Sequence, residues 1–117
     1  MPRYERFRVW HTAREVVREV QLTAAEFGDC GGGLANQLRR AAISIASNIA
    51  EGSEKNSDAE LRRYFAIARG SCAEATAQVT IAYDMGLVNE ERFAALTDRL
   101  DHVGRMLSAF ITRLESG

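Results

Sequence analysis

The sequence predicts an all-α protein, folded as an antiparallel four-helix bundle with up-down-up-down topology. Three observations favour this class. The 117 residues include only one proline and nine glycines, so long segments run without a helix breaker. Apolar residues recur in these segments at alternating steps of three and four, which is the spacing of a helix that buries one face. The connections between the segments are short, and short connections make consecutive helices antiparallel.

The first helix is expected after a short N-terminal arm, residues 1–8. Its apolar stripe consists of Trp10, Ala13, Val17, Val20, Ala24 and Phe27. Gly28 is expected to end the helix, because glycine adopts without strain the left-handed conformation that follows many helices. The next run, GDCGGG, lacks the lysine and the hydroxyl residue of a phosphate-binding loop, so we interpret it as a flexible connector.

The second helix is expected to run from about Leu34 to Glu51 and to end at Gly52. Its bundle-facing stripe consists of Leu34, Leu38, Ala41 or Ala42, Ile45 and Ile49. The segment 41–50, AAISIASNIA, carries no charge on any side. A helix that is apolar or small all round is normally buried all round.

This uncharged segment predicts a subunit interface, covered by a second copy of the chain. The candidate interface residues are Ile43, Ala46, Ser47 and Ala50. Ser44 and Asn48 are expected to hydrogen-bond across the contact. The alternative is that the other three helices wrap the second helix within one chain. We favour the oligomer because each of the other helices shows a single main apolar stripe.

The third helix is expected to begin with a capping box, in which Ser57 caps the helix and Glu60 reaches back to the Ser57 amide. Its apolar stripe consists of Leu61, Phe65, Ala68, Cys72, Ala75, Val79 and Ala82. Gly86 is expected to end the helix, and Leu87 to make the apolar contact that follows such an end.

The fourth helix is expected to begin after Asn89, a residue type that caps helix N-termini, with Glu90 and Glu91 in its first turn. Its apolar stripe consists of Phe93, Leu96, Leu100, Val103, Leu107, Phe110 and Leu114. The whole chain, residues 1–117, is therefore interpreted as one domain, since its length suits a single core.

Three segments carry a family likeness: LRRAAISIASNIAEG at residues 38–52, RVWHTAREVV near the N-terminus and ELRRYFAIARGSCAEATAQV in the third helix. Together they resemble the four-helix-bundle proteins found as open reading frames in 23S rRNA intervening sequences. The likeness covers nearly the whole chain and departs at Ala46, where many relatives carry proline. The resemblance implies a ring-like homopentamer. It also suggests RNA or an RNA-associated protein as a partner, because a related branch, the accessory proteins of diversity-generating retroelements, works with a reverse transcriptase and RNA.

The charge of the chain gives little support to nucleic-acid binding. Its net charge is −1 and its pI is near 6.1, so the molecule as a whole has no basic field to attract phosphate. Such binding would need a local cluster of cations. The candidate contacts to nucleic acid or to another partner are Arg39, Arg40, Arg62 and Arg69. The alternative interpretation of these arginines is a solvated helix surface.

No catalytic, cofactor-binding or metal-ligating residue can be assigned from a motif. His11 and His102 are isolated, without a second histidine at a metal-ligand spacing. Cys72 lies on an apolar stripe and is expected in the core, whereas Cys30 is expected to be an exposed loop thiol. Glu51 is expected to pair with an arginine of a neighbouring helix.

These features predict a non-enzymatic, homo-oligomeric scaffold or adaptor that presents a polar surface to another protein or to an RNA–protein complex. The alternative is an RNA-binding module that acts through arginines gathered by the symmetry of the ring; an undetected enzyme ranks third. No segment has the character of a signal peptide or approaches the ~20 apolar residues that span a bilayer. We therefore expect a cytoplasmic protein with no membrane partner and no cofactor.

Overall fold

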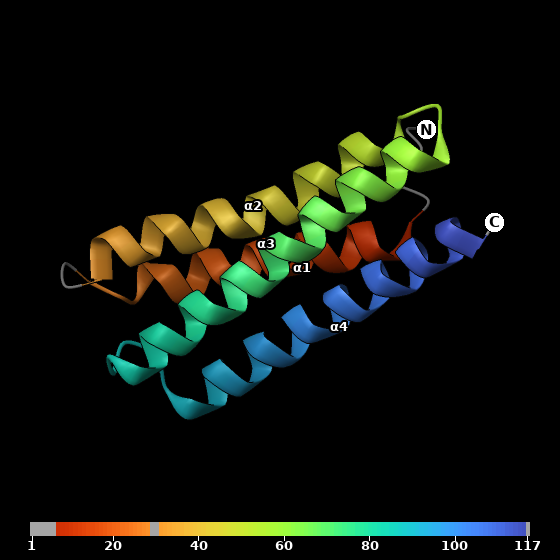
Figure 1. Cartoon of the computed structure of the whole chain (residues 1–117). Coiled ribbons are helices and arrows are strands. Elements are labelled where there is room, and N and C mark those ends of the chain that lie inside the picture. The colour runs from red at the N-terminus through yellow and green to blue at the C-terminus, as the bar shows by residue number, and fades with distance from the viewer. Residues whose placement is uncertain (1–6, 29–30, 117) are drawn as a thin grey trace.

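The computed structural model describes residues 7–28 and 31–116. Within these ranges the chain forms helices and no strand: α1 (Arg8–Ala25), α2 (Gly32–Ser53), α3 (Asp58–Asp84) and α4 (Glu90–Ser116). Figure 1 shows the helices lying side by side, each running opposite to the one before it. The predicted fold of the single chain is therefore confirmed, while assembly into a ring stays a prediction.

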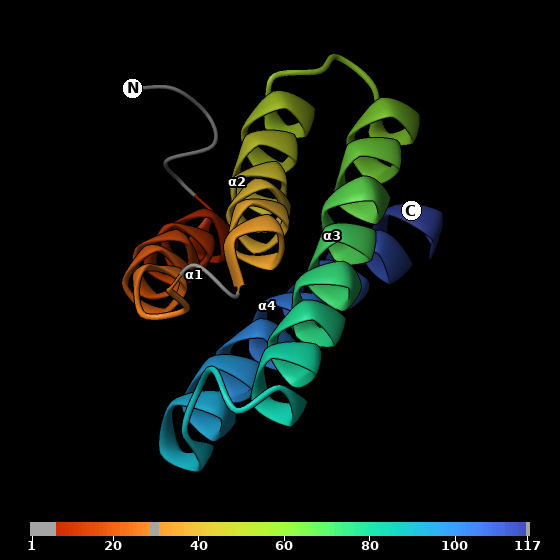
Figure 2. The ribbon, with the colours of Figure 1, turned by 90° about the vertical axis from the view of Figure 1, so that its left-hand side faces the viewer.

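The helices follow one another around the core in chain order (Figure 2). α2 packs on α1 and on α3, α3 packs on α4, and α1 closes the bundle against α4. Of these helix pairs, α2 and α3 pack most extensively, and α1 and α4 pack least extensively. No helix in the described part of the chain is both long enough and apolar enough to cross a membrane.

An aromatic cluster closes one end of the core. Phe65 on α3 is fully buried, and its ring meets the rings of Phe7 and Phe110 edge to face, with centroids 5.9 and 5.4 Å away. Of the predicted arm, residues 1–6 lie outside the described residues, Phe7 belongs to this cluster, and Arg8 already begins α1. Phe7 thereby anchors the start of α1 against α3 and α4.

The predicted core stripe of α1 is wrong by one residue at two positions. Val9 and Val16 are fully buried, whereas their neighbours Trp10 and Val17 are only half-buried. Both sets share Ala13 and keep steps of three and four, so spacing alone does not distinguish them. In the structure, Trp10 and Val17 lie at the edge of the core and line the surface between α1 and α2.

The glycines act differently from one another. Gly28 and Gly86 have φ of +69° and +76° and follow the ends of α1 and α3, as predicted. Gly32 and Gly33 belong to α2, so the connector is shorter than predicted, and Cys30 lies outside the described residues.

Gly52 does not end α2, contrary to the prediction. It lies inside the helix, which continues to Ser53, and it is buried. A Cβ atom at this position would lie 2.7 Å from the Cβ of Tyr64. The glycine is therefore required for the close approach of α2 to α3, and its sequence position near the helix end concealed that packing role.

The predicted N-cap residues of the last two helices are in place, but among the described residues Glu60 makes no return hydrogen bond to the Ser57 amide. The Ser57 hydroxyl accepts a hydrogen bond from the Glu60 amide at 3.2 Å, and the Asn89 side chain accepts one from the Arg92 amide at 2.7 Å. Each satisfies an amide that has no partner inside its own helix. All seven residues of the predicted α3 stripe are buried, so the cap and the apolar spacing of α3 were sufficient to predict this helix and its core face.

Candidate subunit interface

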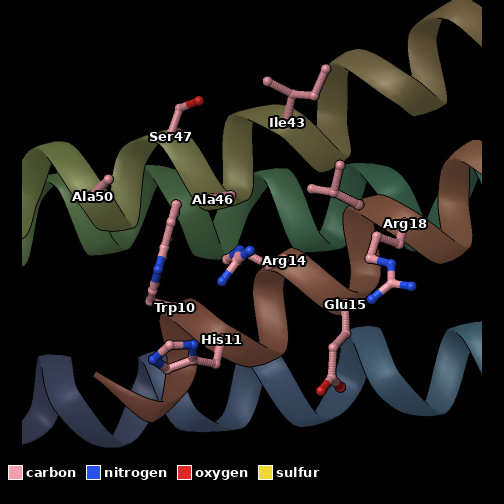
Figure 3. Close-up of a pocket in the computed structure, with 10 residues that line it drawn as sticks. Trp10, His11, Arg14, Glu15, Arg18, Ile43, Ala46, Ser47 and Ala50 are labelled. Atoms are coloured by element: carbon pink, nitrogen blue, oxygen red, sulfur yellow. The ribbon is translucent and has the colours of Figure 1, made fainter. Parts of the chain in front are cut away.

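An open groove of about 630 Å³ runs between α1 and α2 (Figure 3). All four predicted interface residues line it. From α2 these are Ile43, Ala46, Ser47 and Ala50, and α1 contributes Trp10, His11, Arg14, Glu15, Val17 and Arg18. The uncharged sequence pattern of α2 therefore predicted the residues of the α2 wall of this groove.

The α2 residues of the groove differ in depth. Ala46 is 8% exposed and lies at the floor, where α1 covers it. Ala50 is half-buried, whereas Ser47 is exposed and the Ile43 side chain is 54% exposed. In Figure 3, Ile43 and Ser47 extend from α2 on the side away from α1. The apolar surface thus continues from the groove onto the outer face of α2.

The α1 wall combines an aromatic ring with cations. Trp10 reaches across toward α2, and the Arg14 guanidinium lies 5.9 Å from the centroid of its ring, within the range of a cation–π contact. Among the described residues, neither Arg14 nor Arg18 forms an ion pair with an acid. The groove therefore has an apolar floor and a cationic rim.

The acid nearest to these arginines is directed elsewhere. Glu15 points away from α2 in Figure 3 and forms an ion pair with Arg99 of α4. Arg99 also pairs with Glu19, with 3.0 Å between its Nε and the Glu19 Oε1. Both acids of α1 therefore pair with Arg99 of α4 and not with Arg14 or Arg18.

The hydroxyl and amide groups of α2 are used inside the chain, which differs from the prediction. The Ser44 hydroxyl hydrogen-bonds the Ser71 hydroxyl of α3 at 2.8 Å. The Asn48 amide donates to the Ser44 carbonyl at 2.8 Å and to its hydroxyl at 3.1 Å. Ser44 thus joins α2 to α3 and Asn48 bonds within α2, so the groove residues remain as the interface candidates on α2.

The four candidate arginines are not gathered on one surface of the chain. Arg39 donates to Gln21 of α1 at 3.0 Å, whereas Arg69 donates to Ser108 of α4 at 3.3 Å. Arg62 is half-buried on α3 and Arg40 is exposed on α2. Within one subunit, Arg39 is therefore directed toward α1 and Arg69 toward α4.

The pairing predicted for Glu51 is also wrong. Its carboxylate lies 3.9 Å from the Lys55 ammonium, one helical turn later in the sequence, and not beside an arginine of another helix. Both side chains are partly exposed, so the pair contributes little to stability.

Comparison with known proteins identifies the family. A family model described as 23S rRNA-intervening sequence protein matches residues 5–109. The chain belongs to this family. The match confirms the resemblance seen in the three sequence segments, and it includes every residue of the groove. A search of curated proteins gives no match.

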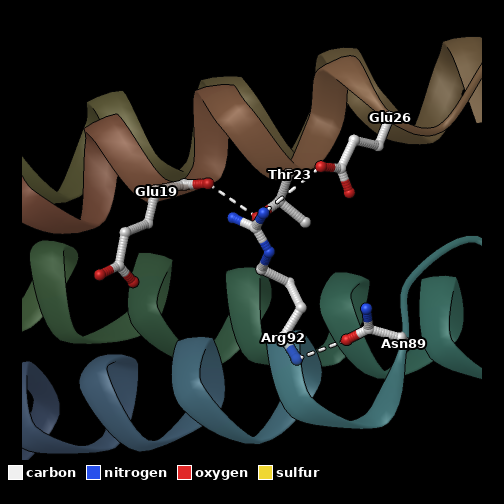
Figure 4. Close-up of polar contacts among 5 residues, drawn as sticks. All are labelled: Glu19, Thr23, Glu26, Asn89 and Arg92. Carbon is white, nitrogen blue, oxygen red and sulfur yellow. Dashed lines mark hydrogen bonds and ion pairs between the residues drawn. The ribbon is translucent and has the colours of Figure 1, made fainter.

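In this 23S rRNA-intervening sequence protein, the α1–α4 side of the bundle differs from the groove side, because polar contacts close it (Figure 4). Arg92 of α4 pairs with Glu26, the residue that follows α1, at 3.3 Å. Thr23, fully buried beside this pair, donates to the Glu19 carbonyl at 2.7 Å. Arg92 and Arg99 of α4 thus pair with acids within the subunit, whereas among the described residues Arg14 and Arg18 at the groove rim form no ion pair.

The buried thiol of the family member has no nucleophilic character. Burial raises the pKa of Cys72 to about 12, because the apolar core disfavours the thiolate. Within the described ranges, no group of three or more His, Cys, Asp or Glu side chains could hold a metal ion. Cys72 is a small core residue of α3, as predicted.

Proposed function

We propose that this family member is a non-enzymatic, homo-oligomeric scaffold or adaptor whose subunits contact one another at the α1–α2 groove. One observation carries the proposal: the uncharged face of α2 opens into a groove with an apolar floor and with Ile43 exposed beside it. Exposed apolar surface next to a groove is typical of a contact between proteins. A second copy of the chain is the partner that is always available to cover it.

The number of subunits follows from the family likeness. Ring-forming members of the family make five the expected number, and a heterologous contact closes into a ring when its rotation allows. Other proteins or RNA–protein complexes would then be recruited by the polar outer surface of the assembly. In this proposal the groove serves assembly, and the outer surface serves recruitment.

The mass of the purified protein in solution tests the assembly. Five chains of 13.0 kDa give a particle of about 65 kDa, which we expect from light scattering at micromolar concentration. A single species of 13.0 kDa would contradict the proposal. A different multiple would retain the oligomer and contradict only the number five.

RNA binding is a second candidate function, favoured by the exposure of one arginine. Arg40 is exposed, and its guanidinium forms no hydrogen bond or ion pair with another described residue. Five symmetric copies would place five such cations on a body whose total charge is about −5, since each chain carries −1. Local charge of this kind would have to overcome a net repulsion of phosphate.

We expect weak or no binding of single-stranded RNA at physiological salt. Any binding that occurs should weaken with salt, with a log–log slope of roughly −0.7 for each phosphate neutralised. Fluorescence anisotropy with a labelled RNA measures both quantities, and Arg40→Gln should flatten the slope for every sequence. Tight binding at physiological salt that this substitution abolishes would make RNA binding the primary function.

A further inference from the structure

The exposed side of α3 carries a second seam with the spacing of a helix–helix contact. The seam consists of Ile67, Gly70, Glu74, Ala77 and Ile81, separated by steps of three, four, three and four. All five residues are exposed, and both isoleucines expose more than two fifths of their surface. The core side of α3 has its own buried stripe, so this outer seam has no function in packing the subunit.

Gly70 supports a packing role outside the subunit. It lies in the middle of α3, where glycine is less favourable than alanine. A Cβ atom built on it would meet nothing within 4 Å, so the fold of the single chain does not require a glycine there. Gly70 and Ala77 flank Glu74 between the two isoleucines, so the residues next to the carboxylate along the seam are small.

Glu74 gives the outer seam a negative charge at its centre. Between Tyr64 and Tyr83, the only charged residues of α3 are Arg69 and Glu74, and Arg69 turns toward Ser108 of α4. Among the described residues, Glu74 forms no ion pair. Arg14 and Arg18 at the groove rim have the opposite charge, and neither forms an ion pair with a described residue.

We infer that the outer seam of α3 from one subunit occupies the α1–α2 groove of the next subunit, with Glu74 beside Arg14 and Arg18. The inference rests on the proposed oligomer and specifies the surface that fills its groove. Arg14 and Arg18 are one helical turn apart, so a single carboxylate can lie between them. One isoleucine, two turns from Glu74, then lies at the Trp10 end of the groove, and the other lies beyond its Arg18 end.

The positions of the two surfaces allow this contact, although the seam is longer than the groove. At 1.5 Å per residue, the groove from Trp10 to Arg18 is roughly 12 Å long and the seam from Ile67 to Ile81 roughly 21 Å long. The groove and the seam share no residue, since the groove is lined by α1 and α2 and the seam lies on α3. Each subunit can therefore use both surfaces at once, which is the head-to-tail arrangement that builds rings.

Charge reversal tests the contact directly. Glu74→Arg should reduce the mass to that of a monomer, because it adds a cation to a groove that already contains two. The double substitution of Arg14→Glu and Arg18→Glu should do the same. All three changes combined should restore the mass of the wild-type oligomer. Asp98→Arg makes the same charge change on α4, outside both surfaces, and should leave the mass unaltered.

A mixing experiment separates this contact from a symmetric one. Ser47→Arg blocks the groove and leaves the seam intact, whereas Glu74→Arg blocks the seam and leaves the groove intact. Mixed at high concentration, the two variants should form a one-to-one dimer of about 26 kDa, from two chains of 13.0 kDa. A groove-to-groove contact would give no such dimer.

The outcomes distinguish the two proposals. An oligomeric wild type whose Glu74→Arg variant keeps the full mass would overturn the seam contact and leave the proposed function standing. An oligomeric wild type whose two blocked variants form no dimer would overturn it as well. A monomeric wild type would overturn the proposed function, and with it the contact inferred here.

Discussion

Arginine in place of Ser47 or Ala50 is expected to split the assembly into monomers of 13.0 kDa, with the helical circular dichroism largely unchanged. Both residues line the groove, beside a rim that already carries Arg14 and Arg18. In the monomer the new guanidinium reaches water. In the oligomer it would be enclosed between two subunits without an acid, and an unpaired charge buried in this way costs several kcal/mol.

The matched control is Ala109→Arg, which places the same charge on an exposed position of α4. We expect this variant to keep the wild-type mass in light scattering. Loss of mass in the control as well would show that any added arginine disrupts the assembly. If the Ser47→Arg and Ala50→Arg variants both retain the full mass, the groove is not the contact between subunits.

Phe65→Ala is expected to have the largest effect on the stability of the subunit. The ring is fully buried and makes edge-to-face contacts with Phe7 and Phe110. Its removal leaves a cavity among three helices, and truncations of buried phenylalanine cost about 3–5 kcal/mol. Urea unfolding followed by circular dichroism measures the loss, at one fixed protein concentration because assembly also stabilises the folded state.

Phe93→Ala provides the comparison for this cavity. Phe93 is half-buried and stacks on Tyr83, with ring centroids 4.5 Å apart, so its loss should cost clearly less than that of Phe65. A Phe65→Ala variant that loses less than about 1 kcal/mol would contradict the aromatic cluster as an anchor of the bundle. Equal losses at the two positions would contradict the difference in their burial.

The helices and their caps could be predicted because their signals are local. Ser57 and Asn89 each cap an amide three residues away, and the α3 stripe repeats without a competing pattern. The sequence gives weaker signals for the packing of one helix on another. Gly52 resembles a helix end in sequence, and its role appears only when Tyr64 is placed against it. Trp10 and Val17 fit a core stripe as well as Val9 and Val16 do.

The candidate interface was predictable only in part. The lack of charge in residues 41–50 identified the α2 wall of the groove, because a charge-free helix face is a property of one segment. The α1 wall depends on whether the Trp10 face or the Val9 face of α1 is turned toward the core, and tertiary packing decides this. The outer seam of α3 could not be predicted from an apolar pattern, because Gly70, Glu74 and Ala77 are not large apolar residues. Their spacing alone did not distinguish the seam from an ordinary solvated helix face.

Hydroxyl-radical footprinting of the wild-type protein tests most directly whether a second subunit covers the groove. Ile43 and Leu22 are similarly exposed in the single chain, at 54% and 62%, but Ile43 borders the groove and Leu22 lies outside it. A covered groove predicts that Ile43 is labelled several-fold more slowly than Leu22 at micromolar concentration. Labelling of the two side chains at similar rates would contradict the groove as the subunit interface.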